Sequence, residues 1–215
     1  MASGSDLVLV LDFDGTVTDR DIGDEICDRF APPSWREIDA AWVRSEISLP
    51  EAQRKMWAEV RCRRDEAIAH ARAIGHLRPG LDELLDRVDR SGGATWLASG
   101  GFDFYIEALL DGKMARFGQA WFNATRFVDG GIEVDFPHAQ LACGRCAVCK
   151  GRVCERARAL ARRVIFVGDG ASDRCAIGCA DELWAVKGSL LARACAERGA
   201  PHRTFTRLDE IEIIA

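Results

Sequence analysis

Residues 7–16 read Leu7-Val8-Leu9-Val10-Leu11-Asp12-Phe13-Asp14-Gly15-Thr16, and this stretch predicts the class of fold. Five consecutive branched apolar residues are typical of a strand buried on both faces, as in a parallel sheet. Asp12 and Asp14 follow at an i, i+2 spacing, which on an extended chain directs both carboxylates to one side. Open α/β sheets bind ligands at this carboxyl edge, where Gly15 allows a sharp turn and Thr16 can offer a hydroxyl to an anion. The acids therefore indicate a catalytic pair, with a strand-ending Asx turn as the simpler alternative.

Polar residues suited to phosphate binding follow two further apolar runs. Ala94-Thr95-Trp96-Leu97-Ala98 leads to Ser99 and then to Gly100, which would expose a backbone N–H group. Val164-Ile165-Phe166-Val167 leads to Gly168-Asp169-Gly170-Ala171-Ser172-Asp173. Lys150 lies at the start of a helical pattern that continues over 153–162. Each of these residues alone is a weak signal, but buried strands that end in this order of polar residues predict one shared site.

Taken in order, these elements resemble the four motifs of the haloacid dehalogenase superfamily of phosphotransferases, over roughly residues 7–205. The resemblance implies an α/β fold with a doubly wound parallel sheet. It also implies hydrolysis of a small-molecule phosphate ester in two steps. Asp12 would attack phosphorus and form an aspartyl phosphate. Asp14 would protonate the leaving group and then activate the water that hydrolyses the intermediate.

The same resemblance implies Mg²⁺ as the cofactor, because the ligands on offer are hard oxygens. Asp12 and Asp169 would bind it through carboxylates, and Asp14 through its backbone carbonyl. Asp173 would hold a metal-bound water or orient the lysine. The phosphoryl oxygens would be held by Ser99, the Gly100 N–H and Lys150.

Residues 19–75 contain helical patterns and no strand-like run. Short helices are expected over 21–30, 34–45, 49–60 and 65–74, the second and third preceded by S/T-x-x-E capping boxes that begin at Ser34 and Ser48. A helical insertion here resembles the cap of the phosphoserine-phosphatase-like subgroup. We therefore expect a helical cap over 19–75 and a catalytic core over 1–18 and 76–215. Asp21 is a candidate substrate-binding residue of the cap, or else a first-turn acid that the helix dipole favours.

Beyond the cap, residues 81–90 predict a helix. Apolar-rich segments at 121–128 and 132–136 flank Asp129-Gly130-Gly131, which predicts a β-hairpin inserted in the core. Two further core strands are expected at 183–186 and 203–206.

Composition agrees with a globular enzyme, at 48% hydrophobic and 29% charged residues. The net charge of −5 argues against a nucleic-acid partner, which usually requires a basic surface. No apolar run reaches membrane-spanning length, and residues 1–6 lack the features of a secretory signal. We therefore expect a cytoplasmic enzyme with no membrane partner, and the sequence does not predict an oligomeric state.

Nine cysteines form a second notable feature of the sequence. Cys143, Cys146, Cys149 and Cys154 follow a C-x2-C-x2-C-x4-C spacing, with His138 just upstream. This spacing can bind zinc or, less readily, an iron–sulfur cluster. The alternative is a loop of reduced thiols over the edge of the site. The other five, expected to be buried small apolar residues, are Cys27, Cys62, Cys175, Cys179 and Cys195.

The substrate stays open at this stage. Segments 30–35 and 99–104 resemble the methionine-salvage branch of the family, which acts on 2-hydroxy-3-keto-5-methylthiopentenyl-1-phosphate. Cys149-Lys150-Gly151 is also similar to phosphoethanolamine and phosphocholine phosphatases. Phosphoserine phosphatases carry Glu where Asp21 stands here, which weakens phosphoserine as the substrate. A biosynthetic sugar phosphate is a further alternative. The non-enzymatic alternatives are a phosphorylatable receiver-like module and a metal- or redox-sensing module that uses the cysteines.

Overall fold

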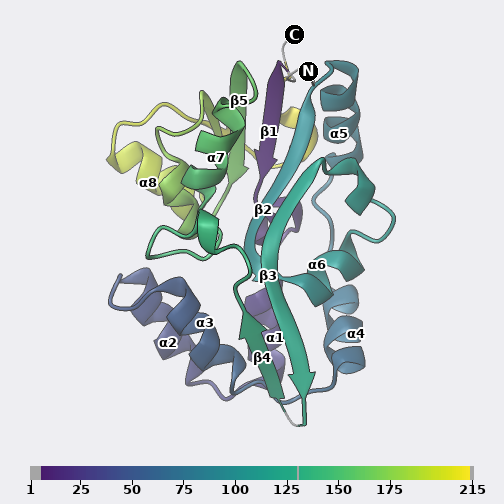
Figure 1. Ribbon diagram of the computed structural model, residues 1–215, viewed down its shortest axis with the longest axis vertical. Coiled ribbons are helices and arrows are strands. Elements are labelled where there is room, and N and C mark those ends of the chain that lie inside the picture. The colour runs from purple at the N-terminus through teal and green to yellow at the C-terminus, as the bar shows by residue number, and fades with distance from the viewer. Residues whose placement is uncertain (1–5, 130, 214–215) are drawn as a thin grey trace.

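The computed structural model describes residues 6–129 and 131–213 and contains a seven-stranded sheet with helices on both faces (Figure 1). The strand order is β4-β3-β2-β1-β5-β6-β7. β1 (Leu7–Leu11) lies in the middle and pairs in parallel with β2 (Ala94–Phe102) and β5 (Arg163–Gly168). The parallel sheet continues through β6 (Glu182–Val186) and β7 (Arg203–Phe205). The predicted doubly wound α/β fold is confirmed.

The alternation of β1 side chains builds a separate core on each face of the sheet. Leu9 and Leu11 pack into the core that contains α5 (Leu81–Arg90). Val8 and Val10 pack into the opposite core with α7 (Lys150–Arg158) and α8 (Leu190–Glu197). All five β1 residues are buried, which explains why the strand is apolar at every position rather than at alternate ones.

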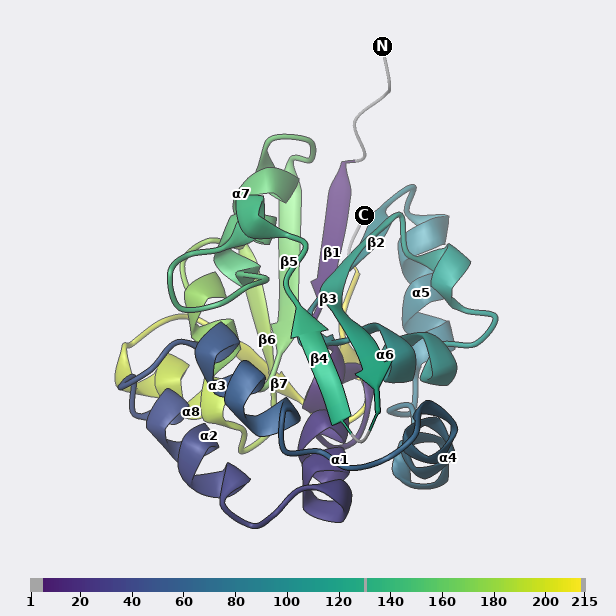
Figure 2. The same ribbon diagram turned by 60° about the horizontal axis from the view of Figure 1, so that its bottom comes forward.

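Four helices lie at the carboxyl end of the parallel strands, and residues of the first three line the cavity over the predicted site. They are α1 (Ile22–Phe30), α2 (Trp35–Val43), α3 (Leu49–Trp57) and α4 (Arg64–Ile74), and Figures 1 and 2 place them at the end of the molecule opposite the N-terminus. The predicted positions are close, but α2 and α3 end earlier than expected. Ser45, two residues after the end of α2, has a left-handed φ of 72° and cannot continue the helix. None of the described helices is long and apolar enough to cross a membrane.

The two predicted capping boxes differ in outcome. Ser48 accepts a hydrogen bond from Glu51 N at 3.3 Å and caps α3 as expected. Ser34 makes no such bond, and its hydroxyl donates to Glu59 Oε2 at 3.4 Å instead. Ser34 is itself in the helical region of backbone angles, so its side chain cannot reach the first N–H groups in the usual way.

The predicted hairpin consists of β3 (Gln119–Val128) and β4 (Gly131–Asp135), paired antiparallel from Ala124↔Asp135 to Val128↔Gly131. β3 also pairs in parallel with β2, so the hairpin extends the main sheet. Gly130 of the expected turn lies outside the described residues. β4 packs beside α3, which connects the sheet edge to the helices over the site (Figure 2).

Candidate active site

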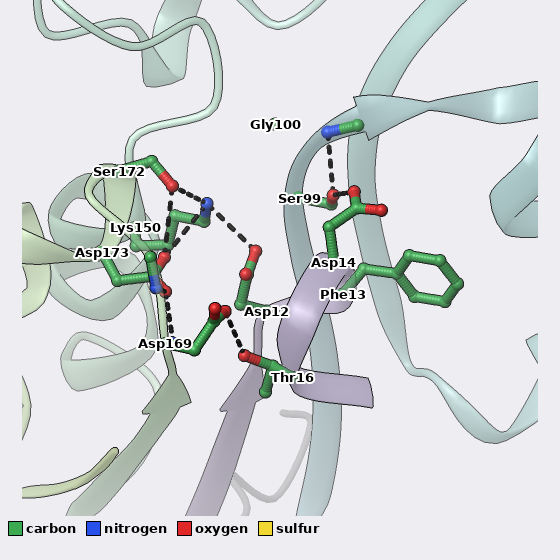
Figure 3. A network of polar contacts seen from close by, with 12 residues as sticks. Asp12, Phe13, Asp14, Thr16, Ser99, Gly100, Lys150, Asp169, Ser172 and Asp173 are labelled. Atoms are coloured by element: carbon green, nitrogen blue, oxygen red, sulfur yellow. Dashed lines mark hydrogen bonds and ion pairs between the residues drawn. The ribbon is translucent and has the colours of Figure 1, made fainter. Parts of the chain in front are cut away.

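The ends of β1, β2 and β5 bring the predicted polar residues together at one edge of the sheet (Figure 3). Leu11 of β1 is in register with Leu97 of β2 and Val167 of β5, so Asp12 and the segment after β5 lie near Ser99, which is within β2 rather than at its end. Asp12, Ser99 and Asp173 are almost completely buried. Lys150 is 1% exposed and is the first residue of α7, three residues earlier than the predicted start of that helix.

Lys150 connects the first and last motifs. Its Nζ lies 3.0 Å from Asp12 Oδ1 and 3.1 Å from Asp173 Oδ1, and it donates to Ser172 Oγ at 2.7 Å. Burial by itself would lower the pKa of Lys150, but the charges of Asp12 and Asp173 raise it above its ordinary value. The lysine is therefore a fixed positive charge next to Asp12.

Asp173 shapes the loop after β5. Its Oδ2 accepts hydrogen bonds from Asp169 N at 2.8 Å and Gly170 N at 2.9 Å, while its Oδ1 faces Lys150. A Cβ at position 168 would lie 2.4 Å from this Oδ2, so only glycine fits there. The G-D-G-x-x-D spacing is thus a closed turn that holds Asp169 toward Asp12.

Asp12, Asp169 and Asp173 form a group suited to a cation. Each offers a carboxylate oxygen, and these oxygens all lie within 4.8 Å of one another. Burial, followed by the charge of Asp173, raises the pKa of Asp12 above its ordinary value. The same two causes raise the pKa of Asp169 to about 7. Buried carboxylates at this distance repel one another, and hard oxygens are the ligands that a divalent cation such as Mg²⁺ prefers.

The turn that follows β1 is fixed against Asp169. Gly15 has a φ of +71°, and a Cβ there would lie 2.4 Å from Asp169 Oδ2. The Thr16 hydroxyl, which we expected to face an anion, donates to Asp169 Oδ1 at 2.9 Å. The side chain of Asp12 faces Lys150, so the contact observed is an ion pair rather than the Asx turn considered from the sequence.

Asp14 lines the same cavity as Asp12 but contacts other groups. Its Oδ1 accepts from Ile22 N at 3.1 Å, and its Oδ2 accepts from Tyr105 Oη at 2.8 Å and, at the long distance of 3.5 Å, from Ser99 Oγ. Burial, then the charge of Asp21, raises the pKa of Asp14 well above its ordinary value. Asp14 is therefore a carboxyl group that favours its protonated form when the site is empty of cations.

Tyr105 is a site residue that the sequence analysis missed. It lies in α6 (Asp103–Leu109), directly after β2, and is 1% exposed. It is the only tyrosine in the chain, and a single phenol within an apolar helix is a signal that could have identified it. A buried Tyr hydroxyl needs a hydrogen-bond partner, and here the partner is Asp14.

Gln53 and Asn123 were also missed, since each lies in an ordinary helix or strand pattern. Both amide groups donate to the carbonyl oxygen of Gly100 at 2.7 Å. The next N–H, that of Gly101, donates to Ser99 Oγ at 2.8 Å. The peptide between Gly100 and Gly101 is thus held from α3, from β3 and from Ser99.

A cavity of about 290 Å³ lies above these residues. Its helical wall has an acidic part and an apolar part, formed by Asp21, Asp24, Asp39, Trp42, Met56 and Trp57. Asp21 lines the cavity and also caps α1 by accepting from Asp24 N at 2.9 Å. Burial, followed by the charges of Asp21 and Asp39, raises the pKa of Asp24 to about 9.

Comparison with known proteins gives one family and two groups of relatives. Residues 9–177 match the family model of haloacid dehalogenase-like hydrolases. The 2-hydroxy-3-keto-5-methylthiopentenyl-1-phosphate phosphatase of Geobacillus thermodenitrificans is 28% identical, over 97% of this chain and 98% of that protein. The bifunctional enzyme MtnB/MtnX of Bacillus licheniformis is also 28% identical, over 92% of this chain but only 46% of that longer protein.

Solved structures with the same fold include phosphoserine phosphatases. A phospho-aspartyl intermediate analogue of phosphoserine phosphatase matches with a TM-score of 0.71 and 18% identity, over 93% of each chain. Phosphoserine phosphatase from T. onnurineus matches with a TM-score of 0.70 and 21% identity, over 98% of this chain and 94% of that one. At these identities the likeness concerns the fold alone.

Proposed function

The chain belongs to the haloacid dehalogenase-like hydrolase family, and on that premise we propose the reaction of this phosphomonoester hydrolase. Asp12 attacks the phosphorus of a small phosphate ester and forms an aspartyl phosphate, which water then hydrolyses. The observation that supports this best is the buried ion pair of Asp12 with Lys150 at 3.0 Å, on the floor of the cavity. The Asp12 carboxylate is fixed beside the ammonium group of Lys150, and the same ammonium group attracts the phosphoryl group of the substrate toward Asp12.

Mg²⁺ fits the donor set, since the buried carboxylates gathered within 4.8 Å offer hard oxygens. We propose that Asp12 and Asp169 hold it through carboxylates and Asp14 through its backbone carbonyl. Asp173, whose two oxygens contact Lys150 and the loop N–H groups, orients the lysine. When bound, the cation neutralises charge on the phosphoryl oxygens. Ser99, the Gly100 N–H and Lys150 hold the same oxygens.

Asp14 supplies and removes the protons in this proposal. The raised pKa of Asp14 keeps a proton available for the departing alkoxide. Once the proton has left, the hydrogen bonds from Tyr105 and Ile22 N stabilise the carboxylate, which can then activate water. One group can thus act as acid in the first step and as base in the second.

Substitution of the nucleophile tests the reaction. Asp12→Asn should abolish phosphate release from every small phosphomonoester, and Asp169→Asn should abolish Mg²⁺-dependent activity. Neither variant should lose stability, because each removes one of several mutually repelling buried acids. Phosphate release and thermal unfolding are measured together. Normal turnover by folded Asp12→Asn would contradict the proposal.

For the substrate, we propose 2-hydroxy-3-keto-5-methylthiopentenyl-1-phosphate, on which the Geobacillus relative acts by name. A cavity of about 290 Å³ suits a small metabolite. Trp42, Met56 and Trp57 in its wall offer apolar and aromatic contacts for a thioether chain. Residues 19–75 would act as the cap, and residues 1–18 and 76–215 as the catalytic core. The hydrogen bond from the Gln53 amide to Gly100 O would then connect the cap to the core.

A second substrate class is favoured by Asp21, Asp24 and Asp39. Acids beside Trp42 suit the cationic amine of phosphoethanolamine, phosphocholine or phosphoserine. Comparison of kcat/KM for these esters and for the thioether ester decides between the classes. Asp39→Asn serves as a probe, since it should weaken turnover of cationic esters and leave the thioether ester little changed.

A further inference from the structure

Four thiols from two distant segments meet beside the site. The sulfurs of Cys143, Cys149 and Cys175 all lie within 4.8 Å of one another. The side chain of Cys149 interacts with those of Cys143 and Cys175, and Cys175 interacts in turn with Cys146, closely enough to shift the pKa of Cys149 and Cys175. All four are free thiols, so none is used in a disulfide.

This set differs from the one that the sequence spacing predicts. Cys154, the expected fourth member, is completely buried on α7 and is not among the three sulfurs that lie within 4.8 Å of one another. The position is taken by Cys175, from the 3₁₀ turn Ser172–Ala176 that follows β5. His138, upstream of the cluster, contacts the backbone of Phe122 instead.

We propose that Cys143, Cys146, Cys149 and Cys175 form a structural zinc site. A tetrahedral site with Zn–S bonds of about 2.3 Å places its sulfurs about 3.8 Å apart. The three mutually close sulfurs need to contract by no more than about 1 Å to reach that spacing. Each thiol loses its proton to solvent as it binds, and no electron is transferred.

The backbone around the cysteines is organised as such a site requires. Cys143 N donates to Cys146 O at 3.3 Å, and Gly144 between them has a left-handed φ of 81°, so this segment is a tight turn. Cys149 N donates to Leu141 O at 3.1 Å. A Cβ at Gly151 would lie 2.3 Å from Cys175 O, which shows how closely the first turn of α7 approaches the second segment.

The position of the cluster indicates what a bound metal would do. Cys149 precedes Lys150 in the chain, and Cys175 lies two residues after Asp173, so the cluster joins the two segments that form the Lys150–Asp173 ion pair. The loop also accepts a hydrogen bond at Arg145 O from Leu49 N, the first residue of α3, at 2.8 Å. Zinc would hold these segments together and would not contact the substrate.

Metal analysis of the whole protein tests the site directly. Wild-type protein purified without chelators should contain about one zinc ion per chain. Metal-free protein, reduced and titrated with Co²⁺, should give the thiolate-to-cobalt charge-transfer and tetrahedral d–d absorption bands. Chelator-treated protein should unfold at lower temperature, and added Zn²⁺ should restore it.

Two matched alanine variants distinguish the proposed ligand set, which contains Cys175, from the set that the sequence spacing suggests, which contains Cys154. Cys175→Ala should lose most of the bound zinc and the four-thiolate cobalt spectrum, whereas Cys154→Ala should keep both. Asp169→Asn, in the acidic site, should keep its zinc as well, so that failure of the Mg²⁺ proposal is told apart from failure of this one.

Three results would overturn the zinc site. One is that the reduced wild-type protein binds neither Zn²⁺ nor Co²⁺ at the cluster, for example because its thiols form disulfides instead. Another is a folded Cys175→Ala protein with full zinc content, and the third is loss of zinc in folded Cys154→Ala. If Cys175→Ala does not fold, the charge-transfer intensity of the cobalt-loaded wild type counts the thiolate ligands instead.

Discussion

Tyr105 donates a hydrogen bond of 2.8 Å to Asp14, although the two residues are 91 positions apart in the sequence. The pair joins the turn after β1 to the helix after β2; Tyr105 is buried, and Asp14 is partly buried in the wall of the cavity. A phenol hydroxyl in this place stabilises the carboxylate form of Asp14 against the effect of burial. Asp14, the residue proposed to transfer protons, is therefore influenced by a partner outside the recognised motifs.

Tyr105→Phe should slow turnover and shift its pH dependence. Without the hydroxyl the pKa of Asp14 rises further, so a smaller fraction is ionised to act as base, and the acidic limb of the kcat profile moves to higher pH. A loss of about tenfold near neutral pH corresponds to one hydrogen bond to a charged group. Steady-state kinetics across pH measure this, with urea unfolding as the control for the fold. An unchanged acidic limb would mean that Tyr105 acts only in packing.

Gly101→Ala should disrupt the same pair by overpacking. A Cβ there would lie 2.1 Å from Tyr105 Oη and 2.4 Å from Asp14 Oδ2. Overpacking of this kind costs about 1–3 kcal/mol of unfolding free energy, and displacement of Asp14 should reduce kcat strongly. Gly100→Ala is the matched comparison, since its nearest neighbour is the flexible end of Leu49 at 3.3 Å. It should be clearly milder in both measurements, and equal losses would contradict the geometric explanation.

Stability in the absence of divalent cations should fall as pH rises. The pKa of Asp169 is raised from 3.8 to about 7, so between these values the folded state binds more protons than the unfolded state. The contribution is fully present below the unfolded pKa and is lost as pH rises through about 7. Mg²⁺ replaces these protons, so it should raise the Tm more at pH 8 than at pH 5. Thermal unfolding with EDTA or Mg²⁺ measures this. If the Tm at pH 8 is the same with and without Mg²⁺, the cation site is excluded.

Arg78 should be needed to keep the turn after β1 in place. Its guanidinium donates to the carbonyl oxygens of Gly15 at 2.6 Å, Thr16 at 2.8 Å and Thr206 at 3.2 Å. Arg78→Met leaves several partly buried carbonyls without this donor, which should lower the unfolding free energy by about 2 kcal/mol. Arg90→Met, an exposed helix arginine, should change it by less than about 0.5 kcal/mol. Denaturant unfolding compares the two variants.

Strands such as β1 and β5 were predictable because each is a short apolar run that is buried along almost its whole length. The helices over the site were predictable from periodicity, but α2 and α3 end at Val43 and Trp57, a few residues before the predicted ends. The contacts of Gln53 and Asn123 could not be predicted in this way, because both side chains bind the carbonyl oxygen of Gly100, which lies far from them in the sequence. The cysteines illustrate the same limit. Spacing along the chain selected Cys154, whereas the sulfur that joins Cys143 and Cys149 in the folded chain belongs to Cys175, from a distant turn.

The central place of β1 in the sheet has a consequence for how the protein is made. Thr16 and Asp169, which share a hydrogen bond in the site, are 153 positions apart. On a ribosome Asp12, the proposed nucleophile, is synthesised before β5, and its pocket cannot close until β5 has left the exit tunnel and paired with β1. Until then one edge of an apolar strand stays open to other chains. Recovery of activity during refolding therefore reports the slowest long-range step, and nascent chains that end before Arg163 are the ones most in need of a chaperone.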